Sequence, residues 1–361
     1  MKLPYKLMSG AEAIRYAFIS ASKKVKNIVL ISEGIQDPSA FYGTTKGLNK
    51  YFKKNRIIEM PLSESALTGV SVGAAINGMR PVLNYHRVEF ALLAMEQIIN
   101  NAAKSHYISF GKHKVPFVLR LVIGRGWGQG PEHSQSLENF FSSIPGLKVV
   151  MPTFPNDTKE LLIGSIKDNN PVIIIEHRWC HYIQGKVKIA YSSSSLESGP
   201  KKITHGKDYT VVATSYMVLE AIEAAKILKK FGINIEVFDL RILRPLKLNK
   251  IISSVNKTGR LLTVDTGFKI LGIGSEIVSE VSEKCFGKLK TPPRRLGFPD
   301  HPTPSSRGYL KNVYPDLYKI CKIITKDLKI SNSRLKLIET EIKSRSNKII
   351  DVPNQLFKGP F

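Results

Sequence analysis

Short runs of apolar residues alternate along the chain with segments in which apolar positions recur at helical spacing. The runs are rich in Val, Ile and Leu with few polar interruptions, which is typical of strands buried on both faces of a parallel sheet. The first half has predicted strands at 27–32, 80–85, 115–123, 147–152 and 171–177, and predicted helices at 11–24, 64–78, 91–108 and 156–168. This alternation predicts an α/β domain over residues 1–185, with a parallel sheet covered by helices.

A polar stretch over residues 186–206, with "YSSSSLESGPKK" in its middle, is the predicted linker. A second α/β domain is predicted over residues 207–330. Its predicted strands are 209–214, 233–240 and 260–265, its predicted helices are 215–230, 246–255 and 273–286, and the Pro-rich segment 291–318 is predicted to be irregular. Residues 331–361 form a C-terminal extension. It begins as a charged helix with an apolar stripe of Leu335, Ile338 and Ile342 and ends in the apolar segment "NQLFKGPF".

The chain is strongly basic, with a formal net charge of +25 over 361 residues. One interpretation is an anionic partner such as a nucleic acid, a membrane surface or an acidic protein, and the other is a solvated basic surface. The sequence has no zinc-finger spacing, RNP-like strand or basic heptad helix, so nucleic-acid binding is not expected.

The apolar runs and the cysteines indicate the cellular compartment in which the protein is expected. No run of eighteen apolar residues is present, which predicts no membrane span, and the N-terminus lacks a secretory pattern. Cys180, Cys285 and Cys321 lie far apart and form no disulfide framework. A reducing, cytoplasmic setting is therefore expected.

A glycine-rich loop, "IGRGWGQGPEHSQSLENFF" over residues 123–141, follows a predicted strand. It lacks the Gly-Lys-Ser/Thr of a phosphate-binding P-loop and is not the dinucleotide fingerprint in its expected place. Ligands of α/β proteins bind at the carboxyl ends of strands, where His133 is expected to lie. Histidine titrates near neutral pH and can transfer protons. Alternatively, His133 is a loop residue that bonds to the backbone.

Two further segments could contribute to a site. In "LSESALTGVSVGAAINGM", Ser63 could cap a helix, and the Glu64 carboxylate could interact favourably with the positive end of that helix. Alternatively, the Glu64 carboxyl could bond a ligand nitrogen. Phe90 follows the strand-end segment "NYHRVE" and is either a core residue or a stacking platform. His86 and Arg87 make this segment more polar than an ordinary core element.

These segments together resemble a known family. "LSESALTGVSVGAAINGMRPV", "AMEQIINNAAKSHYISFG" and "GWGQGPEHSQSLENFFSSIPGLKVVMP", followed by "FDLRILRPLKLNKIISSVNKTGRLLTVDTG" and "PDHPTPSS", are similar to the β subunits of thiamine-diphosphate-dependent 2-oxo acid dehydrogenases, the E1 components. The resemblance covers roughly residues 5–320. It implies a transketolase-like pyrimidine-binding domain followed by a transketolase C-terminal domain.

The resemblance also implies roles for individual residues. Glu64 corresponds to the glutamate that bonds the pyrimidine ring of thiamine diphosphate, and Phe90 to the aromatic residue that stacks on this ring. Leu62 and His86 correspond to positions that line the ring. His133 corresponds to an active-site histidine that donates or accepts a proton at the substrate. "IKDNNP" resembles a loop that binds a monovalent cation such as K⁺ in some members, through Asp168 and Asn170, although it could also be only an Asx-rich turn.

In such enzymes the β chain shares its active site with a separate α subunit in an α₂β₂ heterotetramer. Mg²⁺ and the cofactor diphosphate are expected mainly on α, because this chain shows no GDG-type motif. The implied reaction decarboxylates a 2-oxo acid and passes the acyl group to lipoamide on an E2 protein.

Two other functions remain open from the sequence. The chain could be half of a split thiamine-diphosphate transferase that acts on a sugar or aldehyde without lipoamide, or a non-catalytic α/β scaffold. His86 and Arg87 depart from the apolar or small residues of many members. They could add positive charge for an anionic substrate, or Arg87 could point to solvent.

Overall fold

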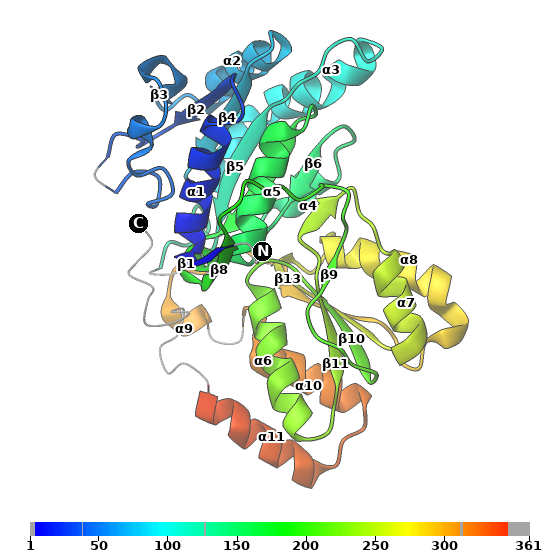
Figure 1. Ribbon diagram of the computed structural model, residues 1–361. Helices are drawn as coiled ribbons and strands as arrows, with labels where there is room; N and C mark the ends of the chain where they lie inside the picture. The colour runs from blue at the N-terminus through cyan, green and yellow to red at the C-terminus, as the bar shows by residue number, and fades with distance from the viewer. Residues whose placement is uncertain (1–3, 38, 126–127, 311–312, 346–361) are drawn as a thin grey trace.

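The computed structural model describes residues 4–37, 39–125, 128–310 and 313–345 (Figure 1). A seven-stranded sheet lies in the upper half of Figure 1 and a five-stranded sheet in the lower half. The larger sheet has the order β12-β6-β7-β5-β4-β2-β3, in which β12 is antiparallel to β6 and the remaining pairs are parallel. Its strands are β2 (Ile28–Ser32), β3 (Ile57–Glu59), β4 (Arg80–Tyr85), β5 (Val118–Ile123), β6 (Lys148–Val150), β7 (Val172–His177) and β12 (Ile242–Arg244).

Both faces of the central strands are buried, as their apolar runs predict. One face packs on α1 (Gly10–Ser22) and α5 (Pro155–Lys167), and the first of these helices begins at a capping box formed by Ser9 and Glu12. The other face packs on α2 (Glu64–Ile76), the 3₁₀ segment η3 (Val88–Ala94), the π segment η4 (Gln97–Ala102) and α3 (Ala103–Ile108). Successive strand residues alternate between the two faces, so Val118 points to one core and Leu119 to the other.

The smaller sheet has the order β14-β13-β10-β11-β9. Helices α6 (Met217–Lys230) and α10 (Leu317–Asp327) cover one face, while α7 (Asn249–Thr258) and α8 (Ile273–Cys285) cover the other. Its strands are β9 (Lys201–Lys202), β10 (Tyr209–Ala213), β11 (Ile235–Asp239), β13 (Leu261–Phe268) and β14 (Arg294–Phe298).

The two sheets share one apolar core. Leu119 and Ile173 of the larger sheet belong to the same buried cluster as Val212 and Phe238 of the smaller one. Strand β12 follows the smaller sheet's β11 along the chain, yet it pairs with β6 at the edge of the larger sheet. The two parts therefore pack as one body rather than as independent units.

The structure also contains several shorter elements and a C-terminal helix. A two-stranded ribbon joins β1 (Tyr5–Ser9) to β8 (Gln184–Lys188), and α4 (Glu138–Ser142) and α9 (Arg307–Leu310) are single helical turns. In the C-terminal extension, α11 (Asn332–Arg345) packs on α6 and α10 through buried Ile338 and Ile342, at the bottom of Figure 1. The predicted apolar segment "NQLFKGPF" lies outside the described residues.

Some predicted elements were wrong. The single helix predicted over 91–108 is a succession of 3₁₀, π and α turns. The segment 291–318, predicted to be irregular, contains β14 and α9. The linker at 186–206 stays a prediction, and this segment contains the end of β8 and all of β9. Strands β9 and β14 lie at the sheet edges, where a strand can be polar and give no apolar run. Among the described residues, no helix is long and apolar enough to span a membrane.

Candidate active site

The candidate site lies where the carboxyl ends of the parallel strands meet. Strand β4 ends at Tyr85 and is followed by residues 86–90, while β5 ends at Ile123 and is followed by the glycine-rich loop. Because these two strands are parallel neighbours, the segment after one and the loop after the other emerge at the same edge. The predicted site residues His86, Phe90 and His133 are all on these two connections.

Glu64 is the first residue of α2 and is 8% exposed. The Tyr85 hydroxyl donates to the Glu64 carbonyl oxygen (2.6 Å) and lies 2.6 Å from the Thr68 hydroxyl, so the start of α2 is tied to the end of β4. Burial raises the pKa of Tyr85, so this hydroxyl remains protonated and able to donate. The Glu64 carboxylate itself forms no hydrogen bond within the described part of the chain. The capping interpretation of Ser63 is wrong, because its side chain forms no capping bond.

Phe90 and His133 come together although they are far apart in sequence. Their ring centroids lie 5.8 Å apart, and the ring planes meet at 84° in an edge-to-face contact. Both side chains are partly exposed rather than enclosed in the core. An aromatic ring and an imidazole are therefore brought into contact, and Phe90 belongs to η3, which packs on α2.

His86 and Leu62 have different surroundings. The Nδ1 of His86 lies 3.2 Å from Oε2 of Glu33, which follows β2 and is 6% exposed. The imidazole also contacts the ring of Phe41, with centroids 4.9 Å apart. Leu62 is 81% exposed, so within this chain it lines no enclosed surface.

Two charged residues in this region were not recognised correctly from the sequence: one interpretation of Arg87 was wrong, and Glu89 was not predicted as a site residue. Arg87 is only 3% exposed, so the interpretation that it points to solvent is wrong. Its guanidinium donates to the Gly124 carbonyl (3.0 Å) and to the side chain of Gln129. Glu89, also buried, accepts a bond from the backbone N–H of Gln135 (2.7 Å). Burial raises the pKa of Glu89, although this N–H and the charge of Arg87 oppose the rise.

Asp168 and Asn170 also come together, but at the opposite end of the sheet. The backbone N–H and side-chain amide of Asn170 both donate to Oδ1 of Asp168 (2.9 Å each), and Lys148 Nζ lies 2.7 Å from Oδ2. Burial would raise the pKa of Asp168, but these contacts outweigh it and lower the pKa. An ammonium group therefore already neutralises the Asp168 carboxylate in this structure, and binding of K⁺ through Asp168 and Asn170 stays a prediction.

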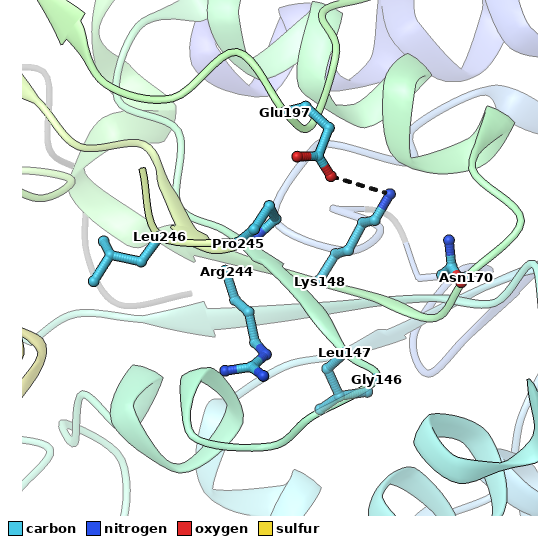
Figure 2. A pocket seen from close by; sticks show the side chains of 8 residues that line it. All are labelled: Gly146, Leu147, Lys148, Asn170, Glu197, Arg244, Pro245 and Leu246. Carbon is cyan, nitrogen blue, oxygen red and sulfur yellow. Dashed lines mark ion pairs between the residues drawn. The ribbon is translucent and has the colours of Figure 1, made fainter. Parts of the chain in front are cut away.

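Lys148 and Asn170 line an open pocket of about 380 Å³ at the edge of the larger sheet where β6 pairs with β12 (Figure 2). Figure 2 shows the Lys148 side chain reaching toward Glu197, with the nearest atoms 3.8 Å apart, and Arg244 on the other side. The Arg244 guanidinium donates to the Ser142 carbonyl (3.0 Å). The charged side chains that line this pocket are thus already paired within the chain. In the described ranges, no group of three or more His, Cys, Asp or Glu side chains could bind a metal ion.

Comparison with known proteins first defines the class. The transketolase pyrimidine-binding domain matches residues 6–180, and the transketolase C-terminal domain matches residues 200–320. A solved structure described as a split gene transketolase, inactive β4 tetramer, superimposes with a TM-score of 0.71. It covers 90% of this chain and 99% of its own, and its sequence is 22% identical, so this likeness shows the fold alone.

Sequence relatives then narrow the class. The pyruvate dehydrogenase E1 component subunit β of Pisum sativum mitochondria is 37% identical over 320 residues, which are 88% of this chain and 89% of the relative. The acetoin:2,6-dichlorophenolindophenol oxidoreductase subunit β of Cupriavidus necator is 40% identical over 80% of this chain and 84% of its own. The pyruvate dehydrogenase E1 component subunit β of Rickettsia bellii is 34% identical over 87% of this chain and 97% of its own length. The chain belongs to the E1 β-subunit family of thiamine-diphosphate-dependent enzymes.

Proposed function

We propose that this chain is the β subunit of a 2-oxo acid dehydrogenase E1 component that decarboxylates a 2-oxo acid and passes the acyl group to lipoamide on an E2 protein. The observation that carries the proposal is the position of Glu64. Glu64 is 8% exposed, and its carboxylate lies at the start of α2 without a hydrogen-bond partner in the described chain. A carboxylate with so little access to water gains from a hydrogen-bonding partner, so a ligand group is expected to supply one.

The residues present fit thiamine diphosphate, whose bound thiazolium supplies a carbon nucleophile for the 2-oxo carbonyl. The Glu64 carboxyl would bond a nitrogen of the pyrimidine ring and share its proton, and the exposed face of Phe90 would stack on the ring. His86 and Leu62 would border the same ring. His133, edge-on to Phe90, would transfer a proton at the substrate oxygen. Mg²⁺ and the diphosphate would be bound by the partner subunit.

Exposed apolar side chains support a partner over this site. Leu62 is 81% exposed, Val70 of α2 62%, and Leu93 of η3 66%. These three, which we call the apolar rim, lie on or next to two elements that pack together beside the site. A partner that covers the apolar rim would also exclude water from the Glu64 carboxylate. We propose the E1 α subunit as this partner, in an α₂β₂ assembly, and a lipoyl-bearing E2 as a further one.

Leu93→Arg is expected to weaken binding of the α subunit by at least about 100-fold, because it would bury an unpaired charge in an apolar contact. Titration of labelled β chain with α, followed by fluorescence anisotropy, measures this change. Phe286→Arg is the matched control, since Phe286 is 84% exposed on the smaller sheet's side and away from the rim. Equal weakening by both variants would contradict the placement of the interface.

The proposed function is tested on the complex co-purified with its α partner. Thiamine diphosphate, Mg²⁺ and a panel of 2-oxo acids are supplied, with ferricyanide as electron acceptor, and acylation of a purified lipoyl domain is then followed. We expect ferricyanide turnover with at least one 2-oxo acid and acylation of the lipoyl domain. Cofactor binding without turnover on any 2-oxo acid, but with transfer to a sugar or aldehyde, would instead establish the split-transferase alternative.

The cellular setting remains part of the proposal. Cys180, Cys285 and Cys321 are free and buried, as expected for a reducing compartment. We propose a cytoplasmic location, which fractionation of the native host with antibodies to the chain would test. Recovery of the chain in an organelle fraction would contradict the cytoplasmic location.

A further inference from the structure

The segment that follows β4 contacts the glycine-rich loop on both sides of His133. Arg87 donates to the carbonyl of Gly124 (3.0 Å) and to the side chain of Gln129, both of which precede the histidine. Glu89 accepts from the backbone N–H of Gln135 (2.7 Å), two residues after it. The same segment then continues to Phe90, whose ring meets the His133 ring.

Both charged side chains are buried, which makes their hydrogen bonds to the loop important. Arg87 is 3% exposed and Glu89 is 9% exposed, and a buried charge is costly unless it is hydrogen-bonded. The bonds to the loop compensate part of that cost, and they are charge-assisted, which makes them stronger than neutral ones. A backbone carbonyl and a backbone N–H are both engaged, so the main chain is held at Gly124, before His133, and at Gln135, after it.

We propose that Arg87 and Glu89 are positioning residues for His133, fixing the loop so that the imidazole stays edge-on to Phe90. Neither residue would touch the reacting atoms; each would act through the loop. The inference rests on the proposed function only where it states that His133 acts on a substrate. The anchoring itself is a property of the β chain.

Amide hydrogen exchange of the full-length β chain tests the anchoring without any activity. Glu89→Ala and Arg87→Ala are expected to speed exchange in the peptide that contains Gln135 by about 10-fold or more, since local opening becomes easier. Glu89→Gln retains an acceptor oxygen and is expected to restore most of the protection. Lys159→Met is the matched control. Lys159 is fully buried and donates to carbonyls on the ribbon side, so its loss perturbs the fold without touching the loop.

A double-mutant cycle in the αβ complex tests the link to His133. Arg87→Ala and Glu89→Ala are expected to lower kcat by about 10–100-fold in the wild-type background, because small misplacements of a catalytic group have effects of this size. In the His133→Ala background the same changes are expected to have less than about 3-fold effect, since residues that act as a unit are not additive.

The outcomes separate the two claims. Unchanged exchange near Gln135, or full additivity with His133→Ala, would overturn the positioning role. An αβ complex that is inactive on every 2-oxo acid, but whose variants show the expected exchange and Glu89→Gln rescue, would overturn the proposed function and leave the anchoring supported.

Discussion

Replacing Glu64 by glutamine is expected to lower kcat of the αβ complex by about 10³-fold, within the range that a positioned acid–base group contributes. Glutamine preserves the shape and one oxygen acceptor, but its amide cannot share a proton with the pyrimidine nitrogen. The substitution should leave the fold intact, because the contact that ties Glu64 to Tyr85 uses the backbone carbonyl rather than the side chain.

The measurement is ferricyanide turnover with saturating 2-oxo acid, alongside titration of thiamine diphosphate by intrinsic fluorescence. Binding of the cofactor is expected to remain within about 10-fold of the wild type, since a single hydrogen bond is altered rather than removed. Ser63→Ala is the matched control, because Ser63 precedes the helix without forming a capping bond, and near wild-type turnover is expected. Turnover of Glu64→Gln within tenfold of the wild type would refute the assigned role.

The central strands were predictable because strands buried on both faces consist of short runs of apolar residues. The predicted runs at 80–85 and 171–177 correspond to β4 (Arg80–Tyr85) and β7 (Val172–His177). The α/β fold class and the E1 β-subunit family were both confirmed. Strand β12 was missed because its partner β6 is distant in sequence, and a three-residue strand has too few positions to show a period. The domain boundaries and the roles of individual residues stay predictions.

The site was predictable only in part, for a related reason. Glu64, Phe90 and His133 could be named because each lies in a motif that resembles the family, and the structure brings Phe90 and His133 into contact. The loop contacts of Arg87 and Glu89 join residues 37 and 46 positions apart, so no local pattern reports them. The sequence does show two charged residues, Arg87 and Glu89, within four residues of the end of a buried strand. A charge buried there needs a hydrogen-bonding partner, which indicates such contacts.

A buried ion pair in the larger sheet ties three parallel strands together. Arg120 of β5 donates from Nε and Nη2 to the two carboxylate oxygens of Glu176 of β7 (2.8 Å each), and from Nη1 to Asn84 of β4 (2.6 Å). His181 Nε2 lies 3.0 Å from the same carboxylate. The Arg120 and Glu176 side chains are 0% and 3% exposed, so neither charge has water to replace a lost partner.

Arg120→Met is expected to lower the free energy of unfolding by about 3–5 kcal/mol, because it leaves the Glu176 carboxylate buried without its main partner. Chemical denaturation of the isolated β chain measures the change. The double variant Arg120→Met, Glu176→Gln is expected to recover a large part of the loss, since no uncompensated charge remains. Lys226→Met removes an exposed ion pair with Glu223 and is expected to leave the free energy of unfolding nearly unchanged. An equally destabilised double variant would show that packing, not charge, dominates at this position.

The same pair sets an acid limit on stability. Burial alone would raise the pKa of Glu176, but the Arg120 charge and the bonds from His181 and Arg120 outweigh it and lower the pKa from 4.5 to about 2. A depressed carboxyl pKa contributes stability above the unfolded value, and this contribution is lost as pH falls from about 4.5 toward 2. The wild type should therefore lose stability over this window more steeply than Glu176→Gln, which has no proton to take up. Parallel slopes of unfolding free energy against pH for the two proteins would mean that the carboxylate is not ionised in the folded state, and that the pair is held by neutral hydrogen bonds.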